Sequence, residues 1–398
     1  MKEPIHPAAT LTTAEEPQFT TAASLPRGFR FGAVSSLAIP RPIGAPPGLG
    51  PLAAFSGNWT GTGFNTIFRP DSTQTPTPLP IPVTGTDNIL ELNLTSETLS
   101  FSPALGSVPN RGMVQGDVFL NGVPYLQSIN DVTIAGETVG IHLEPGLWVI
   151  VPSTSDPAEG QTLVRMASIP HGTTVLAQGR SRTFNGPPTI PSVDITPFST
   201  LGGGKIPFPS QTAANTETAR IPQDLTSFIN AGSITQAMLT DPNTVLRNHI
   251  SGQTITSTTE ISISSNPASP LFGGGTENIA FLLGNAGATA PNAQTLQMTA
   301  TFWIETVEHV LHIPIFKPGQ PPLTIEAAGQ RVQGLAAAKF HVEPPIEITT
   351  PRSIKVHSTQ IQYTQEVMLN FNTLTWPHVS VATLTPAHVL PVPPTAWN

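Results

Sequence analysis

Proline occurs 44 times in this chain of 398 residues, and it is spread along most of the length. Proline donates no backbone hydrogen bond and fixes its own φ, so it is confined to loops, sheet edges, bulges and the first turns of helices. The chain is long enough to bury a sizeable core in two domains, or in one domain with a large insertion. The sequence therefore predicts many strands joined by Pro/Gly-rich turns, and the expected fold class is mainly β.

Charged residues make up only 11% of the chain, and the formal net charge is −8. The 17 Lys and Arg residues do not cluster, which argues against nucleic acid and against an anionic membrane as partners. No segment has the uninterrupted apolar length of a membrane helix. The chain has no cysteine, hence no disulfide and no thiolate ligand. The first residues lack the apolar run of a secretory signal, so a cytoplasmic location is expected.

Alternating apolar and polar residues mark successive strands, as in residues 89–94, and turn pairs such as Asn121-Gly122 separate them. Neighbouring strands at this spacing are typical of an antiparallel up-and-down barrel. The middle of the chain differs, because residues 222–230, 233–239 and 243–250 have the pattern of short helices. The expected organisation is a proline-rich lead-in (1–52), a first part of the barrel (53–180), an insertion or small subdomain with short helices (181–293), strands that complete the barrel (294–386) and a tail (387–398).

A strand-like segment near the C-terminus, residues 376–384, carries a single imidazole with small residues beside it. In a strand the side chains of His378, Ser380 and Ala382 point to the same face. If that face lines the interior of a barrel, a flat ligand has room beside the histidine. The alternative is a hydrogen-bonded histidine in a core strand, and this segment alone does not decide between the two.

Several other segments repeat, in the same order, features of one known family. They are residues 55–63 with Gly57, Trp59, Gly61 and Gly63, then 123–127, 141–148, 169–174, 361–368 and 378–384. Together they resemble the nitrobindin family of haem-binding β-barrels, which are similar to lipocalins and fatty-acid-binding proteins. The resemblance covers roughly residues 52–179 and 346–384, a little over half of the chain. It implies a barrel with a small-molecule ligand in its interior pocket, and haem b as the cofactor.

The resemblance also implies roles for individual residues. His378 matches the proximal ligand of the haem iron, and a neutral imidazole is a good iron ligand. Ser380 and Ala382 leave room for the macrocycle. Three further positions, Thr66, Ile67 and Met368, match family segments against the haem, and His142 matches a family histidine. The family's tyrosine-proline pair before Thr66 is missing here, which leaves the distal contacts open.

Three functions remain open at this point. The first is a haem-binding barrel with a single axial histidine that acts on NO, peroxynitrite or peroxide. The second is a lipocalin-like carrier of an apolar small molecule without haem. The third is a lipocalin-like cyclase of the pericyclase type, for which two barrels with a cleft between them are expected. A homodimer is a further expectation, and the insertion at 181–293 is expected to cap, reshape or block the pocket.

The remaining histidines have simpler interpretations. His142 is also compatible with a structural or surface role, and His171 precedes a glycine in a turn and is expected to be solvated. Glu305, His309 and their neighbours Glu308 and His312 would form a metal site if the segment were helical, because residues i and i+4 share a helix face. Its β-branched and aromatic residues favour a strand instead, which puts His309 and His312 on opposite faces.

Overall fold

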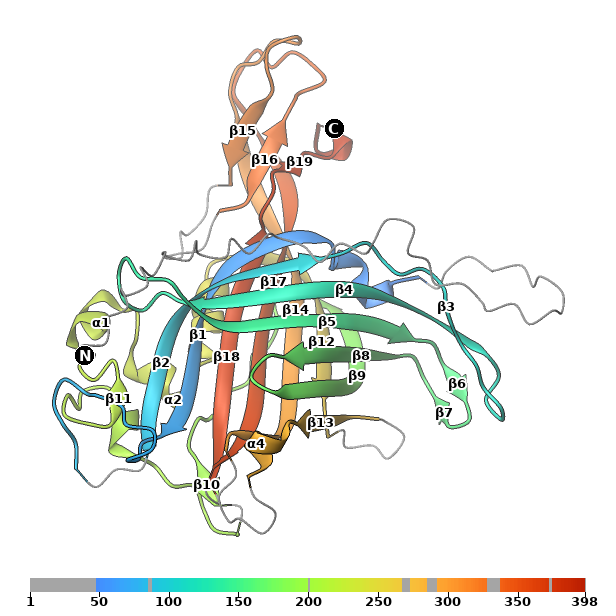
Figure 1. Cartoon of the computed structure of the whole chain (residues 1–398). Coiled ribbons are helices and arrows are strands. Elements are labelled where there is room, and N and C mark those ends of the chain that lie inside the picture. The colour runs from blue at the N-terminus through green and yellow to red at the C-terminus, as the bar shows by residue number, and fades with distance from the viewer. Residues whose placement is uncertain are drawn as a thin grey trace, which may run out of the picture.

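The computed structural model describes residues 48–84, 88–199, 201–266, 273–284, 292–327, 337–371 and 374–397. In this part of the chain, ten antiparallel strands follow one another around a barrel, and the pairing of β2 with β4 closes it (Figure 1). In order around the barrel the strands are β2 (Asn88–Phe101), β1 (Gly57–Pro70), β18 (Leu374–Pro386), β17 (Arg352–Phe371), β14 (Gln294–Ile313), β12 (Thr254–Ser264), β9 (Thr173–Asn185), β8 (Thr162–Ile169), β5 (Val139–Val151) and β4 (Val118–Asp131).

The expected fold class, a mainly β chain with an antiparallel barrel and a few short helices, is confirmed. The described residues form one closed barrel, not the two barrels expected of a lipocalin-like cyclase. The expected boundary after residue 180 falls inside β9, which continues to Asn185. The segment expected to be an insertion also supplies a barrel strand, β12, between β9 and β14. The alternation in β12 is masked by polar Ser and Thr residues, so the sequence analysis placed it outside the barrel.

The first barrel strand, β1, lies very close to its neighbour β18. A Cβ atom at Gly61 would lie 1.9 Å from the carbonyl oxygen of Thr383, and one at Gly63 would lie 2.1 Å from that of Val381. Only glycine fits where two backbones approach this closely. Trp59, two residues before Gly61, is buried in the barrel interior and donates its indole N–H to the Ser56 carbonyl at 2.9 Å. The glycines of this segment thus permit the close approach, and the tryptophan fills the interior.

One end of the barrel interior is filled by aromatic side chains, and we call it the closed end. Phe55 stacks on Phe101 with ring centroids 4.7 Å apart, and Trp148 meets Phe302 edge-on at 5.2 Å. The short 3-10 helix η1 (Gly50–Ala54) leads into this cluster, where Leu52 is fully buried. Burial of this apolar area, at roughly 25 cal/mol per Å², is the main stabilising contribution at this end.

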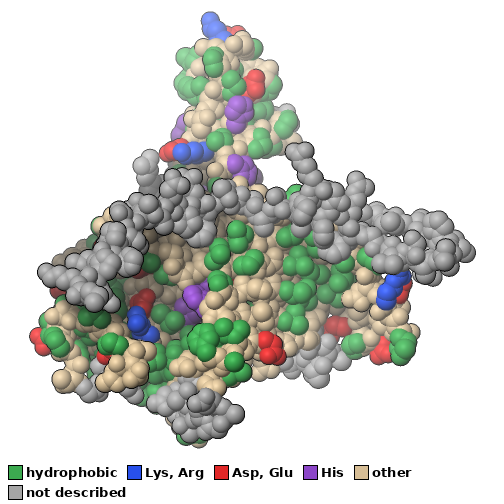
Figure 2. Space-filling model, viewed as in Figure 1, with side chains coloured by type: hydrophobic (Ala, Val, Ile, Leu, Met, Phe, Trp, Pro, Cys, Tyr) green, Lys and Arg blue, Asp and Glu red, His purple; other side chains and the backbone are tan. Residues whose placement is uncertain are grey.

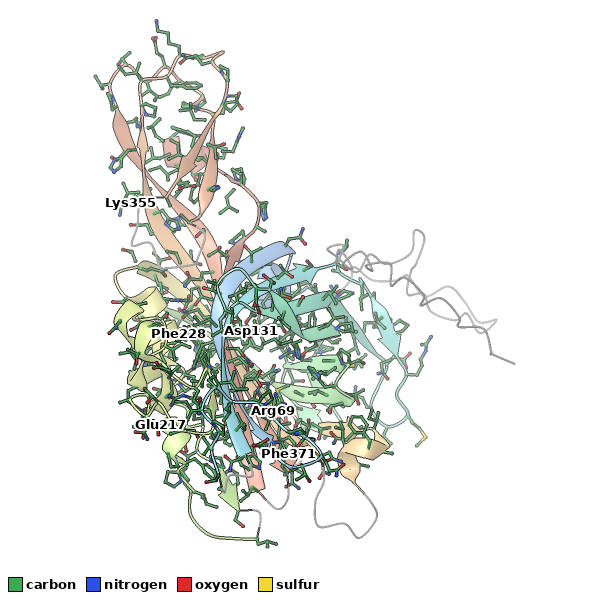
Figure 3. All side chains as sticks on the ribbon, turned by 60° about the vertical axis from the view of Figure 1, so that its left-hand side comes forward. Arg69, Asp131, Glu217, Phe228, Lys355 and Phe371 are labelled. Carbon is green, nitrogen blue, oxygen red and sulfur yellow. The ribbon has the colours of Figure 1, made fainter. Side chains whose placement is uncertain are left out.

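The short helices predicted for the middle of the chain are present as α1 (Thr226–Ala231), α2 (Gln236–Thr240) and α3 (Thr244–Ile250). They cover the outside of the barrel, where residues of the helices pack with outward side chains of β1 and β18 such as Phe64 and Val381. In Figure 3, Phe228 of α1 lies on this side of the barrel. The segment also contains η2 (Pro209–Gln211), β10 (Phe198–Ser199) and β11 (Arg220–Ile221).

Strands β14 and β17 run beyond the barrel into a projection with its own small core (Figure 1). There β15 (Leu323–Glu326), β16 (Lys339–Val342) and β19 (Leu390–Pro391) form a separate sheet, followed by η3 (Pro394–Trp397). This unit was not predicted from the sequence, and its last part, η3 with β19, lies in the twelve residues that were expected to be a tail. Phe316 and Ile348 of this unit pair in one isolated bridge.

The remaining elements are short: β3 (Val108–Asn110), β6 (Thr154–Ser155), β7 (Ala158–Glu159), β13 (Gly275–Asn278) and α4 (Ala280–Leu283). No helix within the described ranges has the length and hydropathy needed to cross a bilayer. Of the expected lead-in, residues 1–47 lie outside the described residues.

Candidate functional site

The end of the barrel opposite the aromatic cluster contains a cavity of about 570 Å³, and we call it the open end. Arg69 and Phe371, at the ends of β1 and β17, lie at this end, away from Lys355 in the projection (Figure 3). Figure 2 shows a histidine side chain inside a hollow of the surface. The apolar walls are formed by Ile67, Ile129, Ile141, Ile169, Leu282, Val367 and Leu369. The polar lining includes His142, His171, His378, Asn65, Asn93, Ser380, Gln127, Tyr363 and Gln365.

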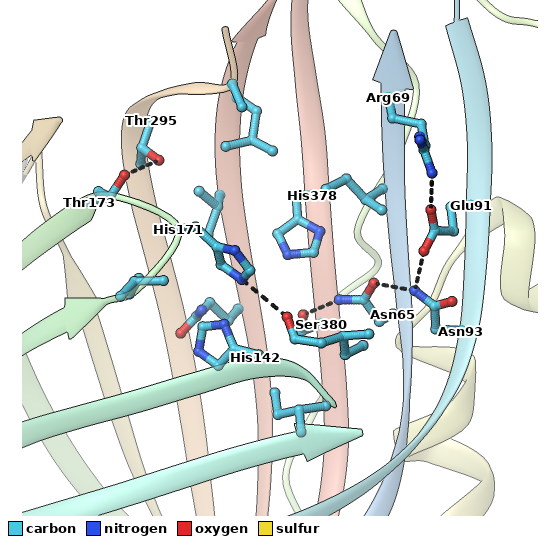
Figure 4. Close-up of a pocket in the computed structure, with 18 of the residues that line it drawn as sticks. Asn65, Arg69, Glu91, Asn93, His142, His171, Thr173, Thr295, His378 and Ser380 are labelled. Carbon is cyan, nitrogen blue, oxygen red and sulfur yellow. Dashed lines mark hydrogen bonds and ion pairs between the residues drawn. The ribbon is translucent and has the colours of Figure 1, made fainter. Parts of the chain in front are cut away.

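His378 points into this cavity from β18, because alternation places it on the inner face with Ser380 (Figure 4). Its Nδ1 lies 3.0 Å from the carbonyl oxygen of Thr66 on the neighbouring strand β1. A carbonyl only accepts hydrogen bonds, so Nδ1 carries the proton and Nε2 keeps its lone pair. Burial, together with the positive charge that His142 and His171 can carry, lowers the pKa of His378 to about 4, so the ring is neutral at neutral pH.

Four of the seven residues predicted from the sequence line the cavity: His378, Ser380, Ile67 and His142. Ala382 lies on the same face of β18, fully buried in the interior core. Alternation turns the side chains of Thr66 and Met368 away, since Ile67 and Val367 beside them face inward. The contact of Thr66 with the site is through its carbonyl oxygen alone.

A chain of hydrogen bonds runs across one wall of the cavity from Ser380 to the rim (Figure 4). Asn65 donates to the Ser380 hydroxyl at 2.7 Å, and Asn93 donates to the Asn65 amide oxygen at 3.3 Å. Asn93 also lies 3.4 Å from the carboxylate of Glu91, which forms an ion pair with Arg69 at 3.5 Å. The Arg69 side chain is 42% exposed. The rim of the cavity thus carries a partly exposed ion pair of Arg69 and Glu91.

Two more imidazoles face the cavity from β5 and from the turn between β8 and β9. Nε2 of His142 lies 3.2 Å from a carboxylate oxygen of Glu144, and Nε2 of His171 lies 3.1 Å from the carbonyl oxygen of Ile141. The two rings are 5.9 Å apart between centroids. Burial, with the nearby His142, lowers the pKa of His171. His171 is exposed in a turn, as expected, and it also contributes to the lining of the cavity.

A buried ion pair lies between the cavity and the aromatic cluster. The guanidinium of Arg165 on β8 bonds to the carboxylate of Glu144, and the same carboxylate accepts the hydroxyl of Tyr125. Both partners are at most 2% exposed. Although burial alone raises the pKa of Glu144, Arg165 and His142 lower it to about 2, so this carboxylate is an anion. Arg165 also donates to Gln365 on the cavity wall at 2.7 Å.

A second buried carboxyl, Glu97 on β2, lies beside the floor of the cavity. It accepts the hydroxyl of Tyr363 at 2.7 Å and the amide of Gln127 at 3.3 Å. Burial raises the pKa of Glu97 to about 7, although these hydrogen bonds oppose the rise. Neither Glu97 nor Arg165 was among the residues predicted from the sequence. For Arg165 a signal was present, since strand alternation places it on the same face as Leu163 and Ala167.

The described residues contain no group of three or more His, Asp or Glu side chains arranged to hold a metal ion. The three cavity histidines therefore do not form a direct metal site. Residues 305–312 are part of strand β14, as the β-branched content indicated, and His309 and His312 bond to Ser358 and Ser353 on β17.

The helical part of residues 181–293 does not cap the cavity, because α1, α2 and α3 lie on the outside of the barrel. Of the described residues in this segment, those near its end reach the site, where Leu282 of α4 and Ala293 line the cavity. Two neighbouring apolar side chains are exposed: Phe281 of α4 at 61%, and Ile279 just before the helix at 52%. The mouth of the cavity therefore has an apolar edge as well as the Arg69–Glu91 ion pair.

Comparisons with known proteins give one match. No protein-family model matches the sequence, and no curated protein matches it. Among solved structures, the chain is similar to Rv2717c from M. tuberculosis, with 8% identity and a TM-score of 0.33 over 86% of this chain and 98% of that one. The assignment of a closed β-barrel rests on the strand pairing of this chain itself.

Proposed function

We propose that the cavity at the open end binds haem b, with Nε2 of His378 as the axial ligand of the iron. The observation that carries the proposal is the state of this imidazole. Its Nδ1 is held by the Thr66 carbonyl, and its pKa is lowered to about 4, so a lone pair on Nε2 is available at neutral pH. In metal-bound histidines, one ring nitrogen usually binds the metal while the N–H of the other nitrogen donates a hydrogen bond to a protein group, which fixes the ring.

The surroundings of His378 fit the rest of such a ligand. A volume of about 570 Å³ lies within the range of pockets that hold cofactors and drug-sized molecules. Ser380, two residues along the same face, is small, and the facing walls are built from isoleucine, valine and leucine. The partly exposed guanidinium of Arg69, which is paired with Glu91 at 3.5 Å, lies at the rim, where carboxylate groups of an otherwise apolar ligand would meet solvent and could share it.

The chemistry expected of the bound group follows from its single axial histidine. Haem held in this way keeps an open position at the iron for NO, peroxynitrite or peroxide. The protein supplies the surroundings of this group. The walls are apolar, and His142 and His171 lie on the wall of the cavity. The Thr66 carbonyl on β1 fixes the orientation of the His378 ring.

Titration of the purified protein with haemin, followed by absorption spectroscopy, tests the proposal. We expect a shifted Soret band at one equivalent in the wild type, and loss or displacement of this band in His378→Ala. The matched control is His249→Ala. His249 is also buried with a pKa lowered to about 4, but it lies outside the barrel and bonds to Thr383 at 2.7 Å. We expect this control to retain the wild-type band.

Two outcomes would contradict haem binding. One is the absence of a Soret shift in the wild type, and the other is an identical band in wild type and His378→Ala. If an apolar dye or a fatty acid bound in the cavity under those conditions, the carrier function without haem would take the place of the proposal.

A further inference from the structure

The three cavity histidines share one arrangement of their ring nitrogens. Each has one nitrogen bonded to an acceptor that carries no proton of its own: the Thr66 carbonyl for His378, the Ile141 carbonyl for His171 and the Glu144 carboxylate for His142. Each bonded nitrogen therefore carries a proton. In a neutral ring this leaves one bare nitrogen per histidine, and none of these second nitrogens has a partner among the described residues.

The acceptors differ in charge, and this separates the roles of the histidines. His378 and His171 bond to neutral carbonyl groups, whereas His142 bonds to a carboxylate that is 1% exposed. A neighbouring anion stabilises the protonated form of an imidazole far more than a neutral carbonyl does. A proton released inside the cavity is therefore best accommodated on His142.

The carboxylate is itself held in place. Arg165 and the hydroxyl of Tyr125 both bond to Oε1 of Glu144, which leaves Oε2 for His142. Arg165 in turn contacts the rings of Tyr125, Trp148 and Phe302 at 5.5 to 5.9 Å. Because the orientation of Glu144 is fixed by the packed core, the orientation of the His142 ring is fixed as well.

We propose that His142 and Glu144 form an acid–base pair that accepts a proton from a weakly acidic ligand bound in the cavity. The bond between hydrogen and the ligand atom breaks, its electron pair stays on the ligand, and the proton moves to Nδ1 of His142. The resulting imidazolium is stabilised by the carboxylate of Glu144. His142 is the proton acceptor, and Glu144 is the positioning residue. The inference builds on the proposed function, which places a ligand in this cavity.

Other titratable groups around His142 affect its protonation and have to be considered in any pH profile. They are His171 from the β8–β9 turn, His378 on β18, Arg165 on β8, Tyr125 on β4, Glu97 on β2, Tyr363 on β17, and the Arg69–Glu91 pair at the rim. Of these, Glu97 has a pKa of about 7, so its deprotonation adds a second negative charge near the pair in the neutral range.

The decisive test is a pH titration of the imidazole nitrogens of the full chain without haem, by ¹⁵N NMR of histidine-labelled protein. His142→Gln assigns the signal. We expect protonation of the His142 ring to require a lower pH in Glu144→Gln than in the wild type, because the variant has lost the neighbouring carboxylate. The same titration curve in both proteins would overturn the proposal.

A variant that keeps the core neutral covers the case in which Glu144→Gln does not fold. Glu144→Gln combined with Arg165→Met removes both buried charges, so no charge is left unpaired. We expect protonation of His142 to require a lower pH in this double variant than in the wild type, by less than in Glu144→Gln, because the loss of the more distant Arg165 charge acts in the opposite direction. Because the titration needs no haem, a failure of haem binding leaves its result interpretable.

A second measurement tests the role toward a ligand. Hydrogen cyanide is a weak acid that loses its proton when it binds ferric haem, so its association rate reports on a nearby proton acceptor. In haem-loaded protein we expect His142→Gln to slow association at least tenfold, at the low end of what general acid–base groups contribute. His249→Gln, on the outside of the barrel, is the control. Equal rates in wild type and His142→Gln would count against the proton transfer.

Discussion

The two ends of the barrel interior are built from the same strands but have opposite properties. At the closed end, β1, β5 and β14 contribute Trp59, Trp148 and Phe302, which fill the space between the strands. At the open end, β1, β18 and β17 contribute Ile67, His378, Ser380 and Val367, and a cavity of about 570 Å³ remains. The difference shows that the size of the inward side chains, and not the number of strands, decides where a ligand has room.

The buried ion pair of Glu144 and Arg165 lies between the two ends. On one side Arg165 contacts the aromatic rings, and on the other Glu144 bonds to His142 at the cavity. A well-packed closed end therefore fixes the polar groups of the open end. Variants at each end should separate stability from ligand binding.

The largest effect is expected from a substitution within the aromatic cluster. Phe55→Ala removes a ring that stacks on Phe101 and meets Trp148 and Phe302, and it should lower the free energy of unfolding by about 3–5 kcal/mol. Leu369→Ala, on the wall of the cavity, should cost about 2 kcal/mol or less, because it enlarges an existing cavity instead of creating a new one. Urea unfolding measures both, and equal losses would remove the distinction between the two ends.

Arg165→Met should destabilise the protein nearly as much as Phe55→Ala does. It should lower the free energy of unfolding by about 3 kcal/mol, because it leaves the Glu144 carboxylate buried without its partner. The double variant Glu144→Gln with Arg165→Met should recover at least half of that loss, because no charge is then left unpaired. A double-mutant cycle by urea unfolding measures the coupling. Additive losses would show that the pair does not act as a unit.

The carboxyl of Glu97 should make stability depend on pH. Its pKa is raised to about 7 in the folded protein, so the folded state holds a proton that the unfolded state has released above about pH 4.5. This contribution is present below pH 4.5 and is lost as the pH rises through 7, by on the order of 1.4 kcal/mol per pH unit.

Glu97→Gln has no such proton and should flatten this part of the profile. Urea unfolding at a series of pH values between 5 and 8 compares the two proteins. Parallel profiles of wild type and Glu97→Gln would contradict the buried, protonated state of this carboxyl.

A smaller effect on stability is expected at the cavity wall itself. Ser380→Leu adds an apolar side chain next to His378 and removes the hydroxyl that accepts the Asn65 amide, so it should lower the free energy of unfolding by about 1–2 kcal/mol. It should nevertheless weaken ligand binding at least tenfold, because it occupies the space of the ligand. Calorimetry or absorption titration with haemin measures the binding. Unchanged affinity would place the ligand elsewhere.

Strand periodicity was sufficient to predict much of this arrangement. The barrel class and the inward face of His378 and Ser380 follow from apolar residues that recur every second position in strands. The three short helices follow from apolar residues that recur every three to four positions. The same periodicity would have excluded one of Thr66 and Ile67, because adjacent residues in a strand face opposite sides. It would also have placed Met368 on the face opposite to Tyr363, which lines the cavity, because the two residues are five positions apart in the same strand.

Other features depend on contacts between distant strands and were not predictable from local patterns. β12 joins the barrel although its outer residues are serine and threonine, because its partners β9 and β14 are already in place. Glu97 and Tyr363 are 266 residues apart in the chain and meet only when β2 and β17 lie in one barrel. The bond from His378 to the Thr66 carbonyl likewise requires β1 and β18 to be neighbours.

A crystal structure of the protein grown with haem would test the central claim most directly. The account predicts a haem inside the open end of the barrel, with its iron bound to Nε2 of His378 while Nδ1 keeps its bond to the Thr66 carbonyl. A haem outside the barrel, or an iron bound to His142 or His171 instead of His378, would contradict it.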